Sequence, residues 1–326
     1  MRRESITAGR LEKTAGNVIA ANKQIIALLA VAAIFYLISY LTSATKFIAI
    51  AHISSFMAMA AMGQTLVFLI AGIDLSVASL LSAAGILLCT LVDKSVPFGI
   101  SVLLVIAASA VVGVLNGLGI SFLRIPPLVM TVAMQYVLRG TTLVATNGKP
   151  IAISTEGLST WVNQGMIGPV TGGILVMLLC GALIMWLLYK TKLGREIFFL
   201  GSSPLVGLMS GISNTGVTIK VYTLAAAITG LTGIMLVGYT GTAAVRIGDS
   251  YLLPSIAAVL LGGTSPLGGK GNVVRTMIGA FILCNTVSLL TVLQMSEAAR
   301  QVIEGIIVLI FIVVNNADIH KKKKKA

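Results

Sequence analysis

The chain has 326 residues, of which 57% are hydrophobic and only 10% are charged, and its net charge is +13. Soluble domains carry about 25% charged residues, so this composition excludes an ordinary soluble protein. Apolar runs of about 20 residues, the length that crosses a bilayer as a helix, recur along the whole chain. The sequence therefore predicts an all-α membrane protein. Its basic excess indicates membrane orientation and contact with lipid headgroups rather than nucleic-acid binding.

The apolar runs predict about ten transmembrane helices in two pseudo-symmetric halves. Their expected ranges are 25–43, 48–71, 76–92, 98–122, 127–145, 169–189, 217–240, 252–265, 274–293 and 300–317. These ranges divide the chain into a basic N-terminal tail (1–24), a transmembrane domain (25–317) and a basic C-terminal tail (318–326). The eighth range is short for a helix that must cross the bilayer alone.

The basic residues predict the orientation of these helices. If the N-terminus lies inside and the helices alternate, the inner side holds both basic tails and most of the basic loop residues. Those loop residues are Arg124, Lys190, Lys192, Arg195, Lys220, Lys270 and Arg275. Because cytoplasmic loops are enriched in Lys and Arg, we expect a multi-pass protein with both termini in the cytoplasm.

One long inner connection, residues 191–216, has helix signals of its own. Ser203 is a candidate N-cap, Pro204 suits the first turn of a helix, and Gly211 is a candidate terminator. A short helix on the cytoplasmic face is a plausible docking surface for a partner protein. The alternative is an ordinary connecting loop.

Two polar or glycine-rich segments interrupt the apolar pattern at corresponding places in the two halves. The first contains Asp74 and Ser76, and the second contains Gly262, Gly263 and Gly268. Interrupted helices of this kind are typical of transporters and point to a solute pathway. The simpler interpretation of Asp74, which we favour, is a cap for the helix that follows.

Three polar residues inside predicted helices are further candidates for the pathway, namely Asn116, Gln135 and Arg139. Polar groups in a membrane are costly and therefore often functional. They also form hydrogen bonds between helices, and the sequence leaves both roles open. The GxxxG pair Gly113 and Gly117 predicts close helix packing.

The sequence contains no recognisable catalytic, metal or nucleotide motif. Its two histidines, His52 and His320, are far apart. The glycine-rich run that ends at Lys270 resembles a phosphate-binding loop, but Gly271 stands where Ser or Thr is required. We therefore expect no cofactor and no enzymatic activity. A membrane transporter fits best, either driven by ATP hydrolysis on another subunit or, as the alternative, coupled to an ion gradient as a secondary transporter.

Four ordered blocks resemble the permease subunits of ribose-type ABC importers, the family that serves ribose, xylose, arabinose, galactose and autoinducer-2. The blocks are MGQTLVFLIAGIDLSVASL (62–80), LRIPPLVMTVAMQYVLRGTTLVATNGKPI (123–151), TKLGREIFFLGSSPLVGLMSGI (191–212) and LPSIAAVLLGGTSPLGGKGNVVRTMIGAFIL (253–283). The chain departs from the family pattern at Ala78, at Phe199 and at Ser202 to Pro204. These departures leave open which ATPase the third block accepts.

The resemblance implies a type II ABC importer-like fold in a bacterial inner membrane. It implies a second permease subunit, identical or paralogous, together with cytoplasmic ATP-binding subunits. A periplasmic or lipid-anchored protein would deliver a sugar or sugar-like solute. The third block would be the segment that couples ATP hydrolysis to transport, with Gly194, Arg195, Gly201, Ser203, Pro204 and Gly211 as its candidate residues.

Overall fold

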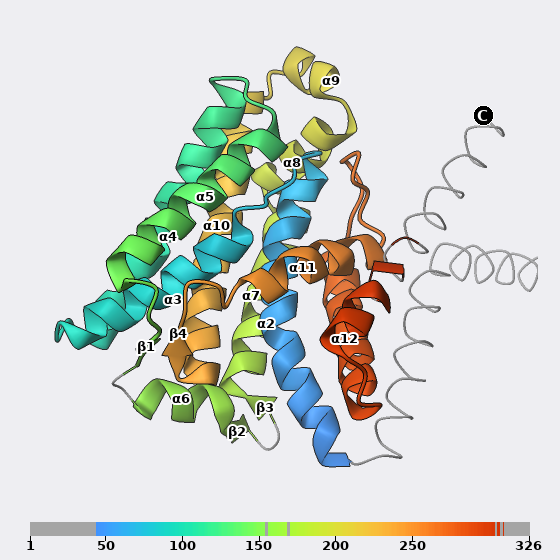
Figure 1. Ribbon diagram of the computed structural model, residues 1–326. Helices are drawn as coiled ribbons and strands as arrows, with labels where there is room; N and C mark the ends of the chain where they lie inside the picture. The colour runs from blue at the N-terminus through green and yellow to red at the C-terminus, as the bar shows by residue number, and fades with distance from the viewer. Residues whose placement is uncertain (1–43, 154–155, 168–169, 304, 307–308, 310–326) are drawn as a thin grey trace, which may run out of the picture.

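The computed structural model describes residues 44–153, 156–167, 170–303, 305–306 and 309 (Figure 1). The first predicted helix (25–43) and both basic tails lie outside these residues, as does most of the last predicted helix (300–317). The described helices are α2 (Ala44–Leu69), α3 (Val77–Asp93), α4 (Phe98–Ser121), α5 (Pro127–Thr146), α6 (Glu156–Asn163), α7 (Gly172–Lys190), α8 (Lys192–Ser202), α9 (Pro204–Met209), α10 (Asn214–Thr240), α11 (Asp249–Leu261) and α12 (Val273–Val292).

Six of the described helices are long and apolar enough to cross a membrane, namely α2, α4, α5, α7, α10 and α12. Two more, α3 and α11, are apolar but shorter. Together they account for the eight predicted ranges between residues 48 and 293. The all-α membrane fold is therefore confirmed, and the total of ten remains a prediction.

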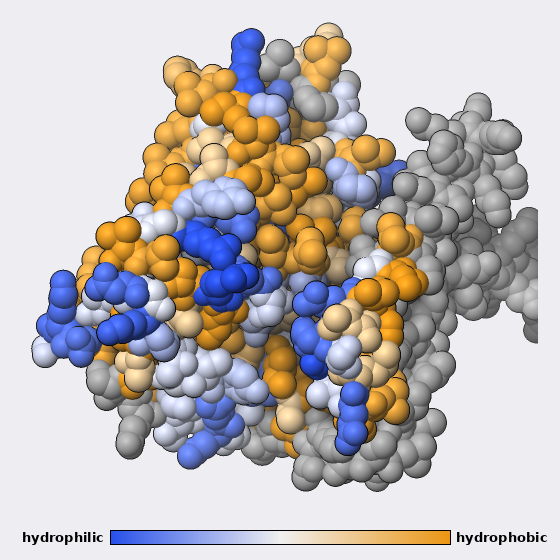
Figure 2. All heavy atoms as spheres, viewed as in Figure 1, coloured by the Kyte–Doolittle hydropathy of each residue, from blue (hydrophilic) through white to orange (hydrophobic). Residues whose placement is uncertain are grey.

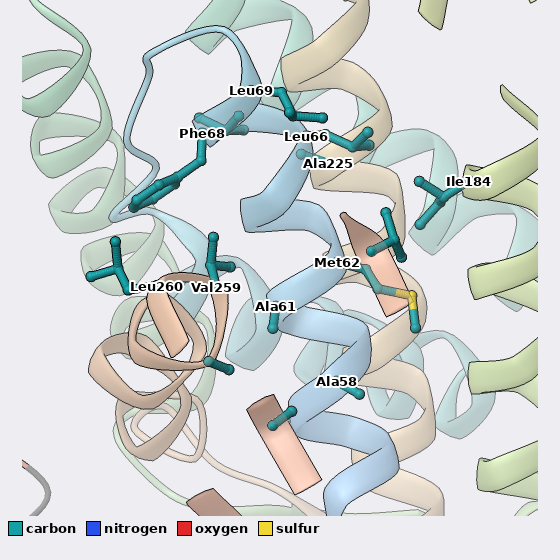
Figure 3. Close-up of a cluster of buried hydrophobic side chains, with 14 of the residues drawn as sticks. Ala58, Ala61, Met62, Leu66, Phe68, Leu69, Ile184, Ala225, Val259 and Leu260 are labelled. Carbon is teal, nitrogen blue, oxygen red and sulfur yellow. The ribbon is translucent and has the colours of Figure 1, made fainter. Parts of the chain in front are cut away.

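Helix α2 forms the centre of the molecule (Figure 1). Figure 3 shows its side chains pointing in several directions, with Ile184 of α7, Ala225 of α10 and Val259 of α11 around it. An α-helix that is apolar all round is stable only when other elements cover every face. By contrast, α4 and α5 expose most of their apolar surface. Figure 2 shows hydrophobic residues over much of the viewed face, with a hydrophilic patch among them.

Helices α4 and α10 pack backbone to backbone through the predicted GxxxG pair. A Cβ atom on Gly117 would lie 2.6 Å from the Cα atom of Ile219, and one on Gly113 would lie 2.6 Å from the Cα atom of Thr223. Only glycine allows this approach. The contact holds α4 against the core even though its outer face is exposed.

The two ends of the bundle differ in structure (Figure 1). At one end, which we call the α6 end, lie α6 and the strands β1 (Ile151–Ala152), β2 (Gly165–Ile167), β3 (Val170–Thr171) and β4 (Thr242–Ala243). The antiparallel pairs are β1 with β4 and β2 with β3. At the opposite end, the α9 end, α8 and α9 form a cap. The strands and α6 were not predicted, because two-residue strands leave no periodic pattern.

Candidate functional site

The connection between α2 and α3, residues 70–76, enters the interior of the protein. It leaves the top of α2 at the α9 end and descends to the middle of the molecule, where α3 begins (Figures 1 and 3). This confirms the predicted interruption at Asp74 and Ser76. An irregular backbone at this depth requires hydrogen-bond partners from neighbouring helices, because lipid supplies none.

Asp74 and Ser76 are both buried within this connection. The Asp74 Oδ1 atom accepts hydrogen bonds from the backbone N–H of Ser76 (2.8 Å) and from its hydroxyl group (2.5 Å). The Ser76 hydroxyl in turn accepts a bond from the side-chain amide of Asn116 on α4 (3.0 Å). Asp74 thus binds Ser76, the N-cap residue of α3, and not an N–H group of the helix itself, so its role as a cap stays a prediction. Through Ser76 it is also linked to Asn116, a pathway candidate on another helix.

Three further side chains hold the same connection from three helices. Gln64 of α2 donates to the backbone carbonyl of Asp74. The hydroxyl of Thr131 on α5 accepts from Leu75 N–H (3.1 Å), and the hydroxyl of Tyr222 on α10 donates to the Ile73 carbonyl (3.4 Å). The sequence analysis did not single out Gln64, Thr131 or Tyr222. Gln64 had the clearest signal, since it is an amide within the apolar run of α2.

The second interruption lies between α11 and α12, as predicted. Helix α11 ends at Leu261, and Gly263 and Gly268 have φ angles of +76° and +84°. These left-handed angles favour glycine. Gly262 lies against α12, where a Cβ atom would be 2.7 Å from the Thr276 backbone nitrogen. The Gly269 N–H then donates to the carbonyl of Leu69, the last residue of α2 (2.9 Å).

The two interruptions meet at the end of α8. A Cβ atom on Gly201 would overlap the Leu69 carbonyl oxygen and would lie 2.5 Å from the Gly269 nitrogen. Three backbones, from α2, α8 and the turn before α12, are therefore in direct contact, and we call this contact the Gly201 junction. Gly194 at the start of α8 is packed equally closely against Leu188 of α7. The sequence analysis did not predict α8 as a helix, nor did it predict the role of Leu69.

The short helix predicted in the inner connection is present as α9, with Pro204 as its first residue. Ser203 directly precedes it, and its proposed role as N-cap stays a prediction. Gly211 ends the segment with φ +76°. The outer face of α8 and α9 carries exposed Arg195 and three exposed apolar side chains. These are Phe199, Leu205 and Met209, and we call this face the α8–α9 surface.

Gln135 and Arg139 lie one and two turns beyond Thr131 on α5, and both are half-buried. The Arg139 guanidinium lies 3.7 Å from the carboxylate of Asp249, which also pairs with Arg246 at 2.9 Å. A hollow of about 360 Å³ is lined by Arg139, Leu143 and Arg246, among others. The structure therefore links Asp74, Ser76 and Asn116 by hydrogen bonds, whereas Arg139 pairs with Asp249.

Interrupted helices packed around a buried polar connection, in a bundle of membrane-spanning helices, define the class of the molecule: a multi-pass membrane permease. The sequence comparisons make this specific. Residues 46–313 match the family described as branched-chain amino acid transport system / permease component, and the chain belongs to this family. No solved structure matches the chain.

Curated relatives agree with the family model. The chain is 35% identical to the ribose import permease protein RbsC of Escherichia coli (strain K12) over 79% of its own length and 82% of the relative. It is 35% identical to RbsC of Bacillus subtilis (strain 168), over 78% and 80% of the two chains. It is 30% identical to the autoinducer 2 import system permease protein LsrD of Escherichia coli O9:H4 (strain HS), over 81% and 82%. The protein is therefore a transmembrane permease subunit of an ABC importer, and it is a multi-pass protein of the inner membrane.

Proposed function

We propose that this permease carries a sugar or sugar-like solute into the cytoplasm, driven by ATP hydrolysis on separate subunits that dock on the α8–α9 surface. A solute-binding protein delivers the solute at the α6 end, and a second permease subunit, identical or paralogous, completes the path. The solute class rests on the relatives, which are named for ribose and for autoinducer 2. In this arrangement the α9 end and both termini lie in the cytoplasm, in accord with the basic tails.

The observation that carries the proposal is that residues 192–211 have one exposed apolar face and one face packed against the rest of the bundle. One side presents exposed Phe199, Leu205 and Met209, which is unusual for a short segment at the end of a bundle. The other side contacts the backbones of α2 and of the turn before α12 through Gly201. A partner that moves α8 and α9 therefore acts directly on both helix interruptions.

This contact suggests how the energy of ATP hydrolysis reaches the solute path. Because no side chain separates the backbones at the Gly201 junction, α8 cannot shift without moving the end of α2 and the residues around Gly268. The end of α2 continues into the connection that holds Asp74, Ser76 and Asn116. Movement of this connection, with tilting of the helices around it, would alternate the access of the path. Gln135 and Arg139 on α5 are candidates for its lining at the α6 end.

The test is reconstitution of the permease in nanodiscs with the ATP-binding subunit and binding protein encoded beside its gene. We expect a stable complex whose ATPase rate rises with solute-loaded binding protein, and ATP-dependent uptake in proteoliposomes. Uptake that requires an ion gradient and no ATPase would overturn the proposal in favour of a secondary transporter.

A charge placed on the α8–α9 surface tests the docking site. Met209→Glu introduces a carboxylate at a side chain that is 83% exposed, so the permease is expected to fold while its affinity for the ATP-binding subunit falls at least tenfold. Leu267→Glu is the matched control, because Leu267 is 73% exposed at the same end but outside α8 and α9. Equal loss of affinity in both variants would contradict this docking site.

A further inference from the structure

The polar cluster at the α2–α3 connection contains more than the hydrogen bonds described above. Gln64, Ser76 and Asn116 are fully buried, and Asp74 is 2% exposed. Within the described residues, the Oε1 atom of Gln64 and the Oδ1 atom of Asn116 have no hydrogen-bond donor. A buried amide oxygen without a donor costs about 1–3 kcal/mol, and two such atoms lie in one small cluster.

Reversing the two amide groups does not remove these unpaired oxygens. The Gln64 amide faces the Asp74 carbonyl, which only accepts, so the atom in that position must be the donating nitrogen. The Asn116 amide faces the Ser76 hydroxyl, whose proton is already donated to the Asp74 carboxylate. The hydroxyl oxygen can therefore only accept from Asn116. Both amide oxygens are therefore left as acceptors without a donor, on side chains that bind the Asp74 carbonyl and the Ser76 hydroxyl.

The charge of the cluster is also unbalanced. No Lys, Arg or His side chain forms an ion pair with Asp74 in the part of the chain that the structure describes. A buried carboxylate without a counterion is strongly disfavoured. The cluster thus places a carboxylate without a counterion together with two unpaired oxygen acceptors, a set of oxygen ligands that suits a small cation.

We propose that this cluster binds a monovalent cation, with Na⁺ as the preferred ion. The Asp74 carboxylate and the side-chain oxygens of Gln64 and Asn116 supply oxygen ligands, which hard cations require. Unwound helix segments in transporters also coordinate Na⁺ through oxygen atoms, which there belong to backbone carbonyls. The ion fixes the connection between α2 and α3 and joins α2 to α4. This site does not rest on the proposed solute or on the ATPase partner.

The test is the thermal stability of the full-length permease in detergent, measured in NaCl, KCl and choline chloride at equal ionic strength. A ligand that binds only the folded state raises the melting temperature with its concentration. We expect a saturable rise of at least about 2 °C in NaCl relative to choline chloride, and a smaller rise in KCl. Equal melting temperatures in the three salts would overturn the proposal. A melting temperature that changes with pH but not with the cation would also overturn it, because a proton on Asp74 would then take the place of the ion.

Variants locate the effect. Asn116→Ala removes one amide oxygen and is expected to raise the Na⁺ concentration of half-maximal stabilisation at least tenfold. Asp74→Asn removes the charge and is expected to abolish the Na⁺ response. If Asp74→Asn does not fold, the Asn116→Ala titration decides alone. Asp93→Asn, at the exposed far end of α3, is the matched control and should respond like the unmodified protein. A Na⁺ response that is unchanged in Asn116→Ala would place the ion elsewhere.

Discussion

Helix α2 is held in different ways towards its two ends. At the α9 end, the Gly201 junction brings three backbones into contact with no side chain between them. At the α6 end, His52 of α2 is held by side chains: its Nδ1 atom lies 2.5 Å from the Thr171 hydroxyl, and its Nε2 atom lies 3.2 Å from the Asn163 side-chain oxygen. Asn163 also donates to the Gly238 carbonyl (3.2 Å). Backbone contacts transmit displacement directly, whereas side chains can change rotamer and absorb it.

From this difference we expect the α9 end to serve coupling and the α6 end to serve stability. The Gly201 junction connects the α8–α9 surface to both helix interruptions, so it is suited to coupling. The network around His52, with the rings of Phe56 and Tyr239 packed edge-on or tilted around it, fastens α2 to α6, α7 and α10. We expect substitutions at the α9 end to reduce transport by more than the loss of folded protein explains. Substitutions at the α6 end should reduce mainly the stability of the protein.

The largest effect is expected from Gly201→Ala. The added methyl group would overlap the Leu69 carbonyl, so the backbones must separate, at a cost of about 3 kcal/mol or more. The melting temperature and the rate of ATP-driven solute uptake should both fall sharply. Gly140→Ala on α5 is the control, since its methyl group meets no atom within 4 Å. Full uptake by Gly201→Ala would show that the junction does not transmit movement.

Asn163→Leu should destabilise the α6 end by about 1–2 kcal/mol, because His52 and the Gly238 carbonyl each lose a part-buried hydrogen bond. Transport per folded molecule is expected to stay near that of the unmodified protein. Melting temperature and uptake, normalised to correctly folded permease, separate these quantities. Ser159→Ala removes only a solvent-exposed hydrogen bond to Asn163 and is the control. A selective loss of uptake would assign this end a part in coupling.

Gly211→Val tests the end of the proposed coupling segment without creating a clash. No atom lies within 4 Å of the added Cβ, so its cost of about 1–2 kcal/mol comes from the φ angle of +76°. Insertion into the membrane should be normal, while ATP hydrolysis continues without equivalent uptake. Gly207→Ala in α9 has no contact closer than 3.7 Å and should remain coupled. Normal solute uptake by Gly211→Val contradicts this prediction.

The smallest effect is expected from Arg246→Gln. The Arg246 side chain is 74% exposed, so its pair with Asp249 contributes about 0–1 kcal/mol, and Arg139 remains beside the same carboxylate. Stability should change little and should become less sensitive to salt. A loss of several degrees in melting temperature would mean that the exposed ion pairs, and not only the His52 network, hold the α6 end together.

Local patterns were sufficient to predict much of the candidate site. Asp74 and Gly263 were found because a carboxylate or paired glycines interrupt apolar runs, and Pro204 and Gly211 because they begin and end a short helix. Gln64, Thr131 and Tyr222 were missed because their partners are 10, 56 and 149 residues away in sequence. The helix α8 was missed because it is short and amphipathic, and a search for membrane spans selects long, uniformly apolar helices.

The sequence by itself determined the membrane class, the eight helices between residues 48 and 293 and the two interruptions, because bilayer thickness and backbone hydrogen bonding leave few alternatives. Only the tertiary structure decided that both interruptions meet α8 at Gly201, that Asn116 reaches Asp74 through Ser76, and that Arg139 pairs with Asp249. Helix periodicity specifies which residues share a face. Which faces meet depends on close packing between helices far apart in the chain, and that information is not local.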